Sequence, residues 1–581
     1  MSDGLASYLD KKSVAHVLEQ IAALMELKGE NPFRLRAFRA AARTVGNFPG
    51  DLREALDDGT LASTKGVGPA TLQIVSELVR TGHSTLLEEL REQVPPGLVE
   101  MLGISGLGVA KIRQIHDTLG IDSLPELEAA ARDGRLAGLP RFGQKTSENI
   151  LKGIGFLRRA SAFRLYHHAA EDAAGLRAAL ERLPGVVAAT VAGEVRRHVE
   201  VVKELVVVLV AEIPPAELFK RLGEIPGLNE IAGRDERQVT LRFAGGTTAQ
   251  IVVTTPVNAG AVLVQATGSA EHLEQLGAHA RSRGCNLTGA ALWRGSTFVP
   301  TPDESHLYAA LGLAWIPPEL REGRGEVAAA GVEAGLPRLL ERGDLVGFLH
   351  CHTGYSDGSN TVEEMARAAR GAGYAYVGIT DHSQAASYAG GLRPDDLLRQ
   401  ADEIDAANER LEGIRVLKGV EADILQDGTI DYESRILERL DFVIGSIHSR
   451  FNMDAAAMTA RMLRAMDNPY LTIIGHPTGR LLLSREPYGL DLDAVIAKAA
   501  TTGVALEINA DPHRLDLDWR ELRRVKEAGV PISIGADAHN TAGIANVDFG
   551  VGIARKGWLG PADVLNCRPV EEFTAFARRR R

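Results

Sequence analysis

The stretch LVGFLHCH at residues 345–352 decides how the C-terminal part of the chain folds. An apolar run leads into two histidines that one residue separates, and successive side chains of a β-strand point to opposite faces. We therefore expect His350 and His352 to share one face of a strand and Cys351 to lie on the other. Two imidazoles on one face at a strand end are suited to chelating a metal ion.

Similar apolar stretches recur downstream, and each is followed by a segment that predicts a helix. With residues 345–352 they make seven strand–helix repeats, the others lying at 376–380, 416–420, 442–447, 471–474, 504–508 and 532–535. Repeated units of this kind predict a parallel sheet, and seven of them predict a βα barrel with one strand fewer than the eight-stranded form. Active-site groups of such barrels lie at the C-terminal strand ends.

Titratable side chains follow these predicted strand ends. The nine candidates, six histidines and three carboxylates, are His350, His352, Asp357, His382, Glu421, His448, His476, Asp537 and His539. Imidazole and carboxylate ligands together suit manganese, zinc or iron better than calcium or magnesium, and we expect manganese first and zinc second. Clustered cations activate water and neutralise a phosphodiester, so we predict phosphoester hydrolysis with these residues as metal ligands and catalytic residues.

Four other polar residues lie near the same strand ends. Arg450 and Arg480 could hold substrate phosphates, but surface salt bridges would explain them as well. Asp381 is interpreted as a group that orients a ligand. His513 is interpreted as loop surface.

Length and composition indicate several globular domains. At 581 residues the chain is too long for one core, and 45% hydrophobic with 24% charged residues is an ordinary globular composition. The net charge of -11 argues against a basic nucleic-acid-binding surface, but residues 1–160 are neutral overall. Three widely spaced cysteines and the lack of a signal peptide or apolar membrane span predict a cytoplasmic protein with no membrane association.

Residues 1–160 predict an all-α region in which one pattern occurs three times. An apolar-glycine hairpin between two helices recurs at 65–68, 105–108 and 140–143, with the glycines Gly66, Gly68, Gly106, Gly108 and Gly143. Glycine permits tight turns, and the free N–H groups that open the second helix attract phosphate. Three copies indicate helix-hairpin-helix binding of DNA without sequence preference. The arginine-rich stretch at 31–39 is either a further DNA contact or a solvated helix face.

Residues 160–320 change to strands that alternate with helices, with strands expected at 186–192, 205–210, 239–243 and 249–253. The hairpins, the motifs TGSAEH at 267–272 and IPPELREGRGE at 316–326, and the C-terminal histidine series together resemble the bacterial family X DNA polymerases. Members of that family join a DNA polymerase beta-like core to a C-terminal PHP (polymerase and histidinol phosphatase) domain. The resemblance covers nearly the whole chain.

The resemblance implies a multidomain fold with six segments. These are an N-terminal helix-hairpin-helix domain at 1–85, a fingers-like helix-hairpin-helix domain at 86–157, an α+β nucleotidyltransferase-like palm at 158–256, a thumb-like domain at 257–320, a linker at 321–343, and a seven-stranded PHP phosphoesterase barrel at 344–581. The linker is rich in glycine and alanine and could let the barrel move. The barrel is expected to hold three divalent metal ions.

The resemblance also locates a polymerase site, which departs from the family pattern. Glu194 replaces a serine two residues before Arg196, Glu204 and Val206 occupy the positions of an aspartate pair, and Gln250 replaces the third aspartate. Valine cannot ligate a metal, and a neutral amide is a poor ligand for hard cations. We therefore expect the DNA-directed DNA polymerase activity that the family implies to be impaired.

These features together predict a DNA-repair enzyme that binds DNA through its hairpins and hydrolyses phosphodiesters in its barrel as a 3'-5' exonuclease. Its expected partner is gapped, nicked or primer-template DNA, bound independently of sequence. One alternative is an active, Mn-dependent gap-filling polymerase. Another is a DNA-binding scaffold whose barrel is a small-molecule phosphatase. The sequence does not predict an oligomeric state.

Overall fold

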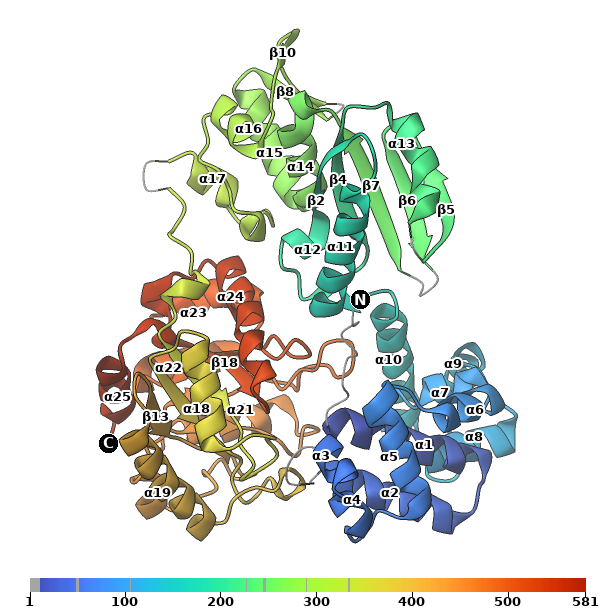
Figure 1. The fold of residues 1–581 in the computed structure, drawn as a ribbon, viewed down its shortest axis with the longest axis vertical. Helices are drawn as coiled ribbons and strands as arrows, with labels where there is room; N and C mark the ends of the chain where they lie inside the picture. The colour runs from blue at the N-terminus through green and yellow to red at the C-terminus, as the bar shows by residue number, and fades with distance from the viewer. Residues whose placement is uncertain are drawn as a thin grey trace.

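The computed structural model describes residues 11–46, 48, 52–104, 106–225, 227–243, 247–288, 290–332 and 335–581. Figure 1 shows a helical N-terminal region in blue, a palm and thumb in green, and a barrel in yellow to red. Residue 105 of the second predicted hairpin lies outside the described residues. No helix of the described ranges is both long and apolar enough to cross a membrane.

The N-terminal region is helical, which confirms the all-α prediction. Its helices are α1 (Lys11–Lys28), α2 (Pro32–Gly46), α3 (Leu52–Asp57), α4 (Thr60–Ser63), α5 (Pro69–Thr81), α6 (Thr85–Gln93), α7 (Pro96–Met101), α8 (Val109–Leu119), α9 (Leu124–Arg132) and α10 (Gln144–Ala160). One apolar core extends from Val14 in α1 to Ile154 in α10. The two expected domains at 1–85 and 86–157 therefore share a hydrophobic core.

The palm is a five-stranded sheet with the order β2-β4-β7-β6-β5. Its strands are β2 (Val186–Val191), β4 (Leu205–Ala211), β5 (Leu228–Arg234), β6 (Gln238–Phe243) and β7 (Thr248–Thr254), with α11 (Tyr166–Glu181), α12 (Gly193–Arg196), α13 (Pro215–Arg221) and the short pair β1 (Arg164–Leu165) and β3 (Val201–Val202) around them. Strands β4 and β7 are parallel, and the other pairs are antiparallel. Strand β5 escaped sequence prediction because it is an edge strand with mostly exposed side chains and no apolar alternation.

The thumb packs helices against a small antiparallel sheet. Its elements are α14 (Ala259–Thr267), α15 (Ala270–Ser282), β8 (Cys285–Thr288), β9 (Ala291–Arg294), β10 (Thr297–Val299), α16 (Glu304–Ala310) and α17 (Glu326–Ala330). The thumb core includes Val327 and Ala330, and Arg321 is fully buried. The first part of the expected linker at 321–343 is therefore packed against the thumb rather than free, because its apolar residues and its arginine find buried partners there.

The C-terminal region is a parallel barrel. Its strands are β11 (Gly347–Cys351), β12 (Tyr376–Ile379), β13 (Arg415–Lys418), β14 (Glu421–Asp423), β15 (Ile444–Ser446), β16 (Ile473–Ile474), β17 (Ala505–Asn509) and β18 (Ile532–Ala538). The helices are α18 (Val362–Gly371), α19 (Pro394–Arg410), α20 (Ser434–Leu437), α21 (Ala455–Ala465), α22 (Leu492–Thr502), α23 (Trp519–Glu527), α24 (Val547–Lys556) and α25 (Val570–Arg578).

The order of this sheet explains why eight strand segments correspond to the seven predicted ones. The order is β13-β12-β11-β18-β17-β16-β15-β14, and only Gly419 and Val420 separate its two end strands in the chain. One chain segment thus joins both edges and closes the barrel. Gly419 is required at this break because a Cβ there would lie 2.6 Å from the Phe442 ring and 2.7 Å from the Ile379 carbonyl oxygen.

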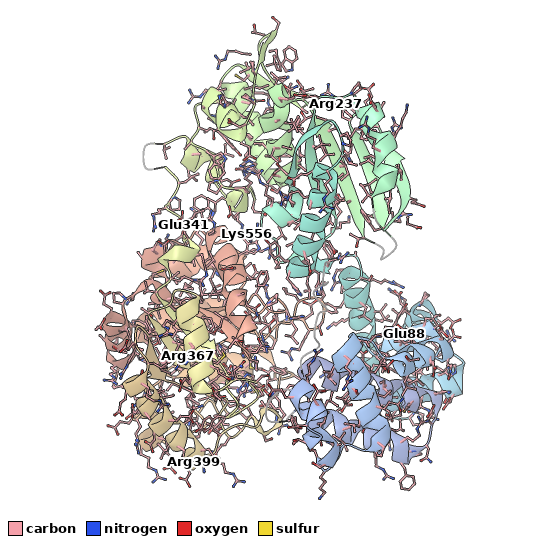
Figure 2. All side chains as sticks on the ribbon, viewed as in Figure 1. Glu88, Arg237, Glu341, Arg367, Arg399 and Lys556 are labelled. Carbon is pink, nitrogen blue, oxygen red and sulfur yellow. The ribbon has the colours of Figure 1, made fainter. Side chains whose placement is uncertain are left out.

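The barrel contacts the other two regions at separate places. Trp519 Nε1 of α23 donates to Glu200 of the palm at 2.9 Å. Lys556, labelled in Figure 2 where the barrel meets the palm and thumb, donates to the Arg197 carbonyl oxygen at 3.0 Å. On the helical side, Lys11 Nζ donates to the Gly358 carbonyl oxygen at 2.8 Å. The helical region therefore lies beside the loops that follow the barrel strands.

Candidate metal centre and DNA-binding surfaces

The nine candidate ligands lie together at the C-terminal ends of the barrel strands. Three sets have ligand atoms within 4.8 Å of one another: His352, Asp357, His382 and His539; His350, His352 and Asp537; and His382, Glu421 and His448. His476 completes the group, since its Nε2 lies 3.0 Å from Glu421 Oε1 and 3.2 Å from His448 Nε2. The tertiary structure thus brings all nine residues to one site.

Backbone strain accompanies several of these positions. His350, His476 and Asp537 have φ angles of 64°, 26° and 51°, in the left-handed region that residues other than glycine seldom adopt. Such a conformation costs of order 1 kcal/mol and persists where surrounding structure fixes it. The rings of His350 and His352 lie close together, as the strand period predicts, with ring centroids 5.4 Å apart, and both residues belong to one of the three ligand sets.

Buried polar atoms at the centre have the character of metal ligands. Nitrogen or oxygen atoms that are fully buried and form no hydrogen bond within the described chain include His350 Nε2, His352 Nδ1, His382 Nδ1, Glu421 Oε2 and His476 Nδ1. Nδ1 of His382 and Oε2 of Glu421 lie 2.9 Å apart without the alignment of a hydrogen bond. Leaving such atoms unpaired is unfavourable, and a shared cation would satisfy them. The donor set therefore fits divalent metal ions.

The protonation states of these side chains follow from burial and mutual charge. Burial, together with the neighbouring imidazoles, lowers the pKa of His352 to about 3, so this ring is neutral and can ligate. Burial disfavours the charge of Glu421, but the imidazoles around it outweigh burial and hold its pKa well below the usual range. Burial also disfavours the charge of His448, but Glu421 and Asp423 together outweigh burial and raise the pKa of that ring to about 10.

Two carboxylates outside the predicted set hold ligand histidines in place. Glu507 Oε1 accepts from His350 Nδ1 at 2.5 Å, and its Oε2 accepts the backbone N–H of His476 at 2.7 Å. Asp423 Oδ1 accepts from His448 Nδ1 at 2.7 Å. Carboxylates of this kind fix the ring orientation of a ligand. A sequence signal existed for Asp423, which follows Glu421 by two residues, but none existed for Glu507, which has no predicted ligand near it in the chain.

Asp381 orients a loop rather than a histidine. Its carboxylate accepts from the Thr353 N–H at 2.8 Å, from the Ser356 N–H at 3.1 Å and from Gln400 Nε2 at 2.5 Å. These bonds shape the turn that presents Asp357. Asp381 therefore acts on the loop that carries Asp357, in agreement with its interpretation as an orienting group.

Of the two explanations left open for Arg480, the structure shows the salt bridge. Arg480 binds Asp518 at 2.6 Å and the Arg514 carbonyl oxygen at 2.9 Å, so it is a structural residue and not a free phosphate contact. Arg514 Nε instead lies 3.7 Å from Asp537 Oδ2 and forms no hydrogen bond with the described residues. Burial opposes its charge, but four carboxylates together outweigh burial and raise the pKa of the guanidinium, Asp537 contributing most, followed by Asp511, Glu421 and Asp516. The exposed His513 bonds Asp511 at 3.0 Å, consistent with loop surface.

The palm residues that the family resemblance assigned to a polymerase site form hydrogen bonds within the chain. Gln250 Nε2 donates to both carboxylate oxygens of Glu204 at 3.0 and 3.1 Å. Glu194 accepts the Lys203 N–H at 2.6 Å. Val206 pairs with Gln250 across β4 and β7. The Glu204 carboxylate is thus bonded to the Gln250 amide on the neighbouring strand.

Arg196 of the same site is turned toward the thumb. Its two terminal nitrogens lie 2.6 and 2.9 Å from the oxygens of Glu304. The buried Arg321 binds the same carboxylate at 2.6 and 2.9 Å. Burial opposes the charge of Glu304, but the two guanidinium groups lower its pKa to about 2. In this arrangement Arg196 is part of a palm–thumb ion cluster.

The predicted hairpins have the expected helix starts. Gly68, Gly108 and Gly143 are the N-caps of α5, α8 and α10. Apart from each glycine and its chain neighbours, no heavy atom of the described residues lies within 4 Å of a Cβ built on any of these three glycines, so the space beside each N-cap is open. Gly66 and Gly106 have φ angles of 105° and 79°. A Cβ on Gly66 would also lie 2.4 Å from Thr44 Oγ1.

The arginine-rich stretch at 31–39 forms the start of α2 and combines both expected features. Leu35 and Phe38 are buried, so one side of the helix is core. Phe33 is exposed, and the Arg36 guanidinium lies 4.6 Å from the centre of its ring. Arg34 is paired with Glu30 at 2.7 Å. The stretch is therefore a helix over its core, with a solvated arginine-bearing face.

Comparison with known proteins matches this architecture. Family models match a helix-hairpin-helix domain at residues 10–84, a SAM-like helix-hairpin-helix tandem at 98–155, a DNA polymerase beta thumb at 262–322 and a PHP domain at 349–510. The DNA polymerase/3'-5' exonuclease PolX of Bacillus subtilis (strain 168) is 37% identical over 575 residues, which cover 98% of this chain and 100% of that protein.

Other relatives match a smaller part of the chain. A probable phosphatase of Caldanaerobacter subterraneus subsp. tengcongensis is 33% identical over 201 residues, which cover 33% of this chain and 74% of that protein. A probable phosphatase of Caldicellulosiruptor saccharolyticus is 30% identical over 239 residues, which cover 39% of this chain and 94% of that protein.

Fold and site define a DNA-binding helix-hairpin-helix and polymerase-thumb assembly joined to a phosphoesterase-type PHP barrel. The whole-chain match is more specific than this class, because it spans every region in the same order. The chain belongs to the bacterial family X DNA polymerases of the PolX type.

Proposed function

We propose that this chain is a 3'-5' exonuclease of DNA repair, in which the barrel hydrolyses phosphodiesters of DNA that the helical region binds. The observation that carries the proposal is the cluster of nine ligand-type side chains, several with buried unpaired atoms, beside the helical region. Open helix N-termini at three hairpins support DNA contact through backbone amides. Gapped, nicked or primer-template DNA in the cytoplasm is the proposed substrate.

The nine residues would hold three divalent ions, with manganese preferred and zinc the second choice. Bound cations would supply charge neutralisation for the phosphodiester and activation of water. The chain itself contributes neutral His352 and ionised Glu421 and Asp537 as ligands. Arg514 would hold the substrate phosphate, since its half-buried guanidinium remains charged and lies beside the candidate ligand Asp537.

We further propose that polymerisation is impaired. The bonds between Gln250 and Glu204 and the capture of Arg196 by Glu304 support this, because they leave one carboxylate at the three aspartate positions and engage the arginine elsewhere. A working polymerase with weak Mn-dependent catalysis from Glu204 is the alternative that the test must separate.

The test follows a 5'-labelled primer on a template with Mn²⁺, with and without dNTPs. We expect shortening under both conditions in the full-length protein, and neither shortening nor extension in Asp537→Ala. If Asp537→Ala still extends the primer and the double variant Asp537→Ala/Glu204→Ala does not, the proposal that polymerisation is impaired is refuted. Nuclease activity that survives in both His350→Ala and Asp537→Ala would overturn the assignment to the barrel.

A second candidate function has one observation in its favour. Relatives that match 33% and 39% of this chain bear the name probable phosphatase. If the barrel acted on small esters, the protein would hydrolyse p-nitrophenyl phosphate with Mn²⁺ and leave the labelled primer intact. If the protein shortens the primer and releases no p-nitrophenol from p-nitrophenyl phosphate, the phosphatase candidate is excluded.

A further inference from the structure

A groove separate from the nine-residue site lies between the helical region and the barrel. It is bounded by helix α10, which follows the third hairpin, and by two barrel loops near residues 451 and 486, and its volume is about 540 Å³. One loop begins three residues after His448, and the other follows His476 on the next strand. A ligand in this groove would therefore lie beside the strand ends that present metal ligands.

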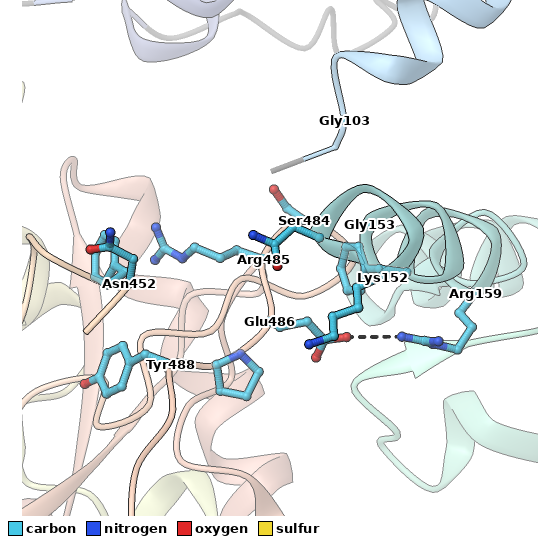
Figure 3. Close-up of a pocket in the computed structure, with 13 residues that line it drawn as sticks. Gly103, Lys152, Gly153, Arg159, Asn452, Ser484, Arg485, Glu486 and Tyr488 are labelled. Carbon is cyan, nitrogen blue, oxygen red and sulfur yellow. Dashed lines mark hydrogen bonds and ion pairs between the residues drawn. The ribbon is translucent and has the colours of Figure 1, made fainter. Parts of the chain in front are cut away.

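The groove has an excess of positive charge, although the chain as a whole is acidic. Lys152 and Arg159 project from α10, and Arg485 lies across from them on the barrel side, as Figure 3 shows. Glu486 is the one acidic side chain among the described residues that line the groove, and it is paired with Arg159 at 3.4 Å. Among the described residues, the Lys152 side chain forms neither an ion pair nor a hydrogen bond.

Aromatic and amide groups accompany these cations. The Arg485 guanidinium lies 4.2 Å from the centre of the Phe451 ring, which stacks on Tyr488 with centroids 6.2 Å apart. The side-chain amides of Asn149 and Asn452 line the same cavity and bond no other described side chain or carbonyl. Cations that follow a backbone, with aromatic faces between them, are the combination that binds single-stranded nucleic acid.

The volume of the groove fits single-stranded DNA and is too small for a duplex. Its volume is within the range of small-ligand pockets, about 300–1,000 Å³, which cannot admit a duplex. The Arg159–Glu486 ion pair connects its two walls. We infer that this groove binds the single-stranded DNA next to the 3' end, holding the nucleotides on the 5' side of the bond to be cleaved. The inference rests on the proposed exonuclease function and adds the path of the strand.

The experiment measures binding without cleavage, so that it does not depend on nuclease activity. The full-length chain carrying Asp537→Ala is titrated with a 5'-fluorescent (dT)12 oligonucleotide and, separately, with a blunt 20-base-pair duplex, and anisotropy gives each Kd. Lys152→Glu and Lys152→Glu/Asn452→Ala are the test variants. Lys220→Glu is the matched control, because Lys220 is an exposed lysine on helix α13 of the palm, away from the groove.

We expect Lys152→Glu to raise the Kd for (dT)12 about tenfold and the double variant to raise it further, with the duplex Kd changed less than twofold. The slope of log K against log salt for (dT)12 should become shallower by about 0.7 for each phosphate that the variant no longer neutralises. An oligonucleotide with 5-iododeoxyuridine near its 3' end should cross-link to Phe451 or Tyr488 on irradiation.

Three results would overturn the inference: no binding of (dT)12 by the parent protein, equal Kd values in Lys152→Glu and Lys220→Glu, or cross-links confined to other segments. Wild-type protein that shortens no primer, while Lys152→Glu still weakens (dT)12 binding, would refute the exonuclease proposal and leave the groove as a strand-binding site. If the wild-type protein shortens the primer but the groove variants bind (dT)12 with the Kd of the parent, the groove inference is refuted and the exonuclease proposal is not.

Discussion

Glu507→Gln is the substitution that tests most directly how the barrel prepares its metal centre. The carboxylate accepts two N–H groups, from the His350 ring at 2.5 Å and from the His476 backbone at 2.7 Å. Glutamine has the same shape but only one acceptor oxygen, so one of these N–H groups would face the amide NH₂. A hydrogen bond to a charged group contributes about 1.5–3 kcal/mol, which corresponds to roughly 10- to 150-fold in an equilibrium constant.

We therefore expect the Mn²⁺ concentration for half-maximal activity to rise roughly 10- to 100-fold in Glu507→Gln, in line with other residues that orient metal ligands. The assay is hydrolysis of bis-p-nitrophenyl phosphate during Mn²⁺ titration, with bound metal measured on the same samples. The rate at saturating Mn²⁺ should stay within about threefold of the parent, because Glu507 is not one of the nine ligands. Glu412→Gln, an exposed glutamate between α19 and β13, is the matched control. An unchanged Mn²⁺ requirement in Glu507→Gln would refute the positioning role.

Three further predictions concern the site, the thumb and the junction. Asp537→Ala should abolish primer shortening in the gel assay and change the duplex Kd less than threefold, and a large decrease in DNA affinity would contradict separate binding and cleavage sites. Glu304 has its pKa lowered from 4.5 to about 2 by Arg321 and Arg196, so it contributes about 3 kcal/mol of stability above pH 4.5 that is lost as the pH falls toward 2. Glu304→Gln should therefore unfold at a lower urea concentration at pH 7, as followed by tryptophan fluorescence. Its free energy of unfolding should also fall less between pH 4.5 and pH 2 than that of the parent, and an equal fall in both proteins would contradict this. Glu200→Ala should raise hydrogen exchange in helix α23 by about tenfold, because it removes the palm acceptor of that helix, and unchanged exchange would show that the junction does not depend on this hydrogen bond.

Local sequence rules located the barrel because its chemistry follows one strand at a time. An apolar run that ends in His350 and His352 needs only the two-residue period of a strand to place both rings on one face. The hairpin glycines were equally readable, since Gly66 and Gly106 satisfy a local need for positive φ. The third hairpin shows the limit of that rule, because Arg141 adopts the same left-handed conformation without being glycine.

Other features depend on which segments meet, and no local pattern contains that information. The edge strand β5 lacks apolar alternation and becomes a strand only by pairing with β6. Arg480 has the same sequence surroundings as a phosphate-binding arginine, yet the fold places Asp518 and two carbonyl groups around its guanidinium. Arg514 is the residue that faces the metal ligands instead.

The sequence by itself determined the domain order, the hairpins and the nine ligand-type residues, because strand period, glycine conformation and ligand chemistry act over a few residues. Only the tertiary structure decided that Glu507 orients two ligands, that Arg196 is drawn into the thumb by Glu304, and that α10 forms a charged groove with the barrel loops. Charge and hydrogen bonding act over a few ångströms of space, and the fold alone sets those distances between segments that are far apart in the chain.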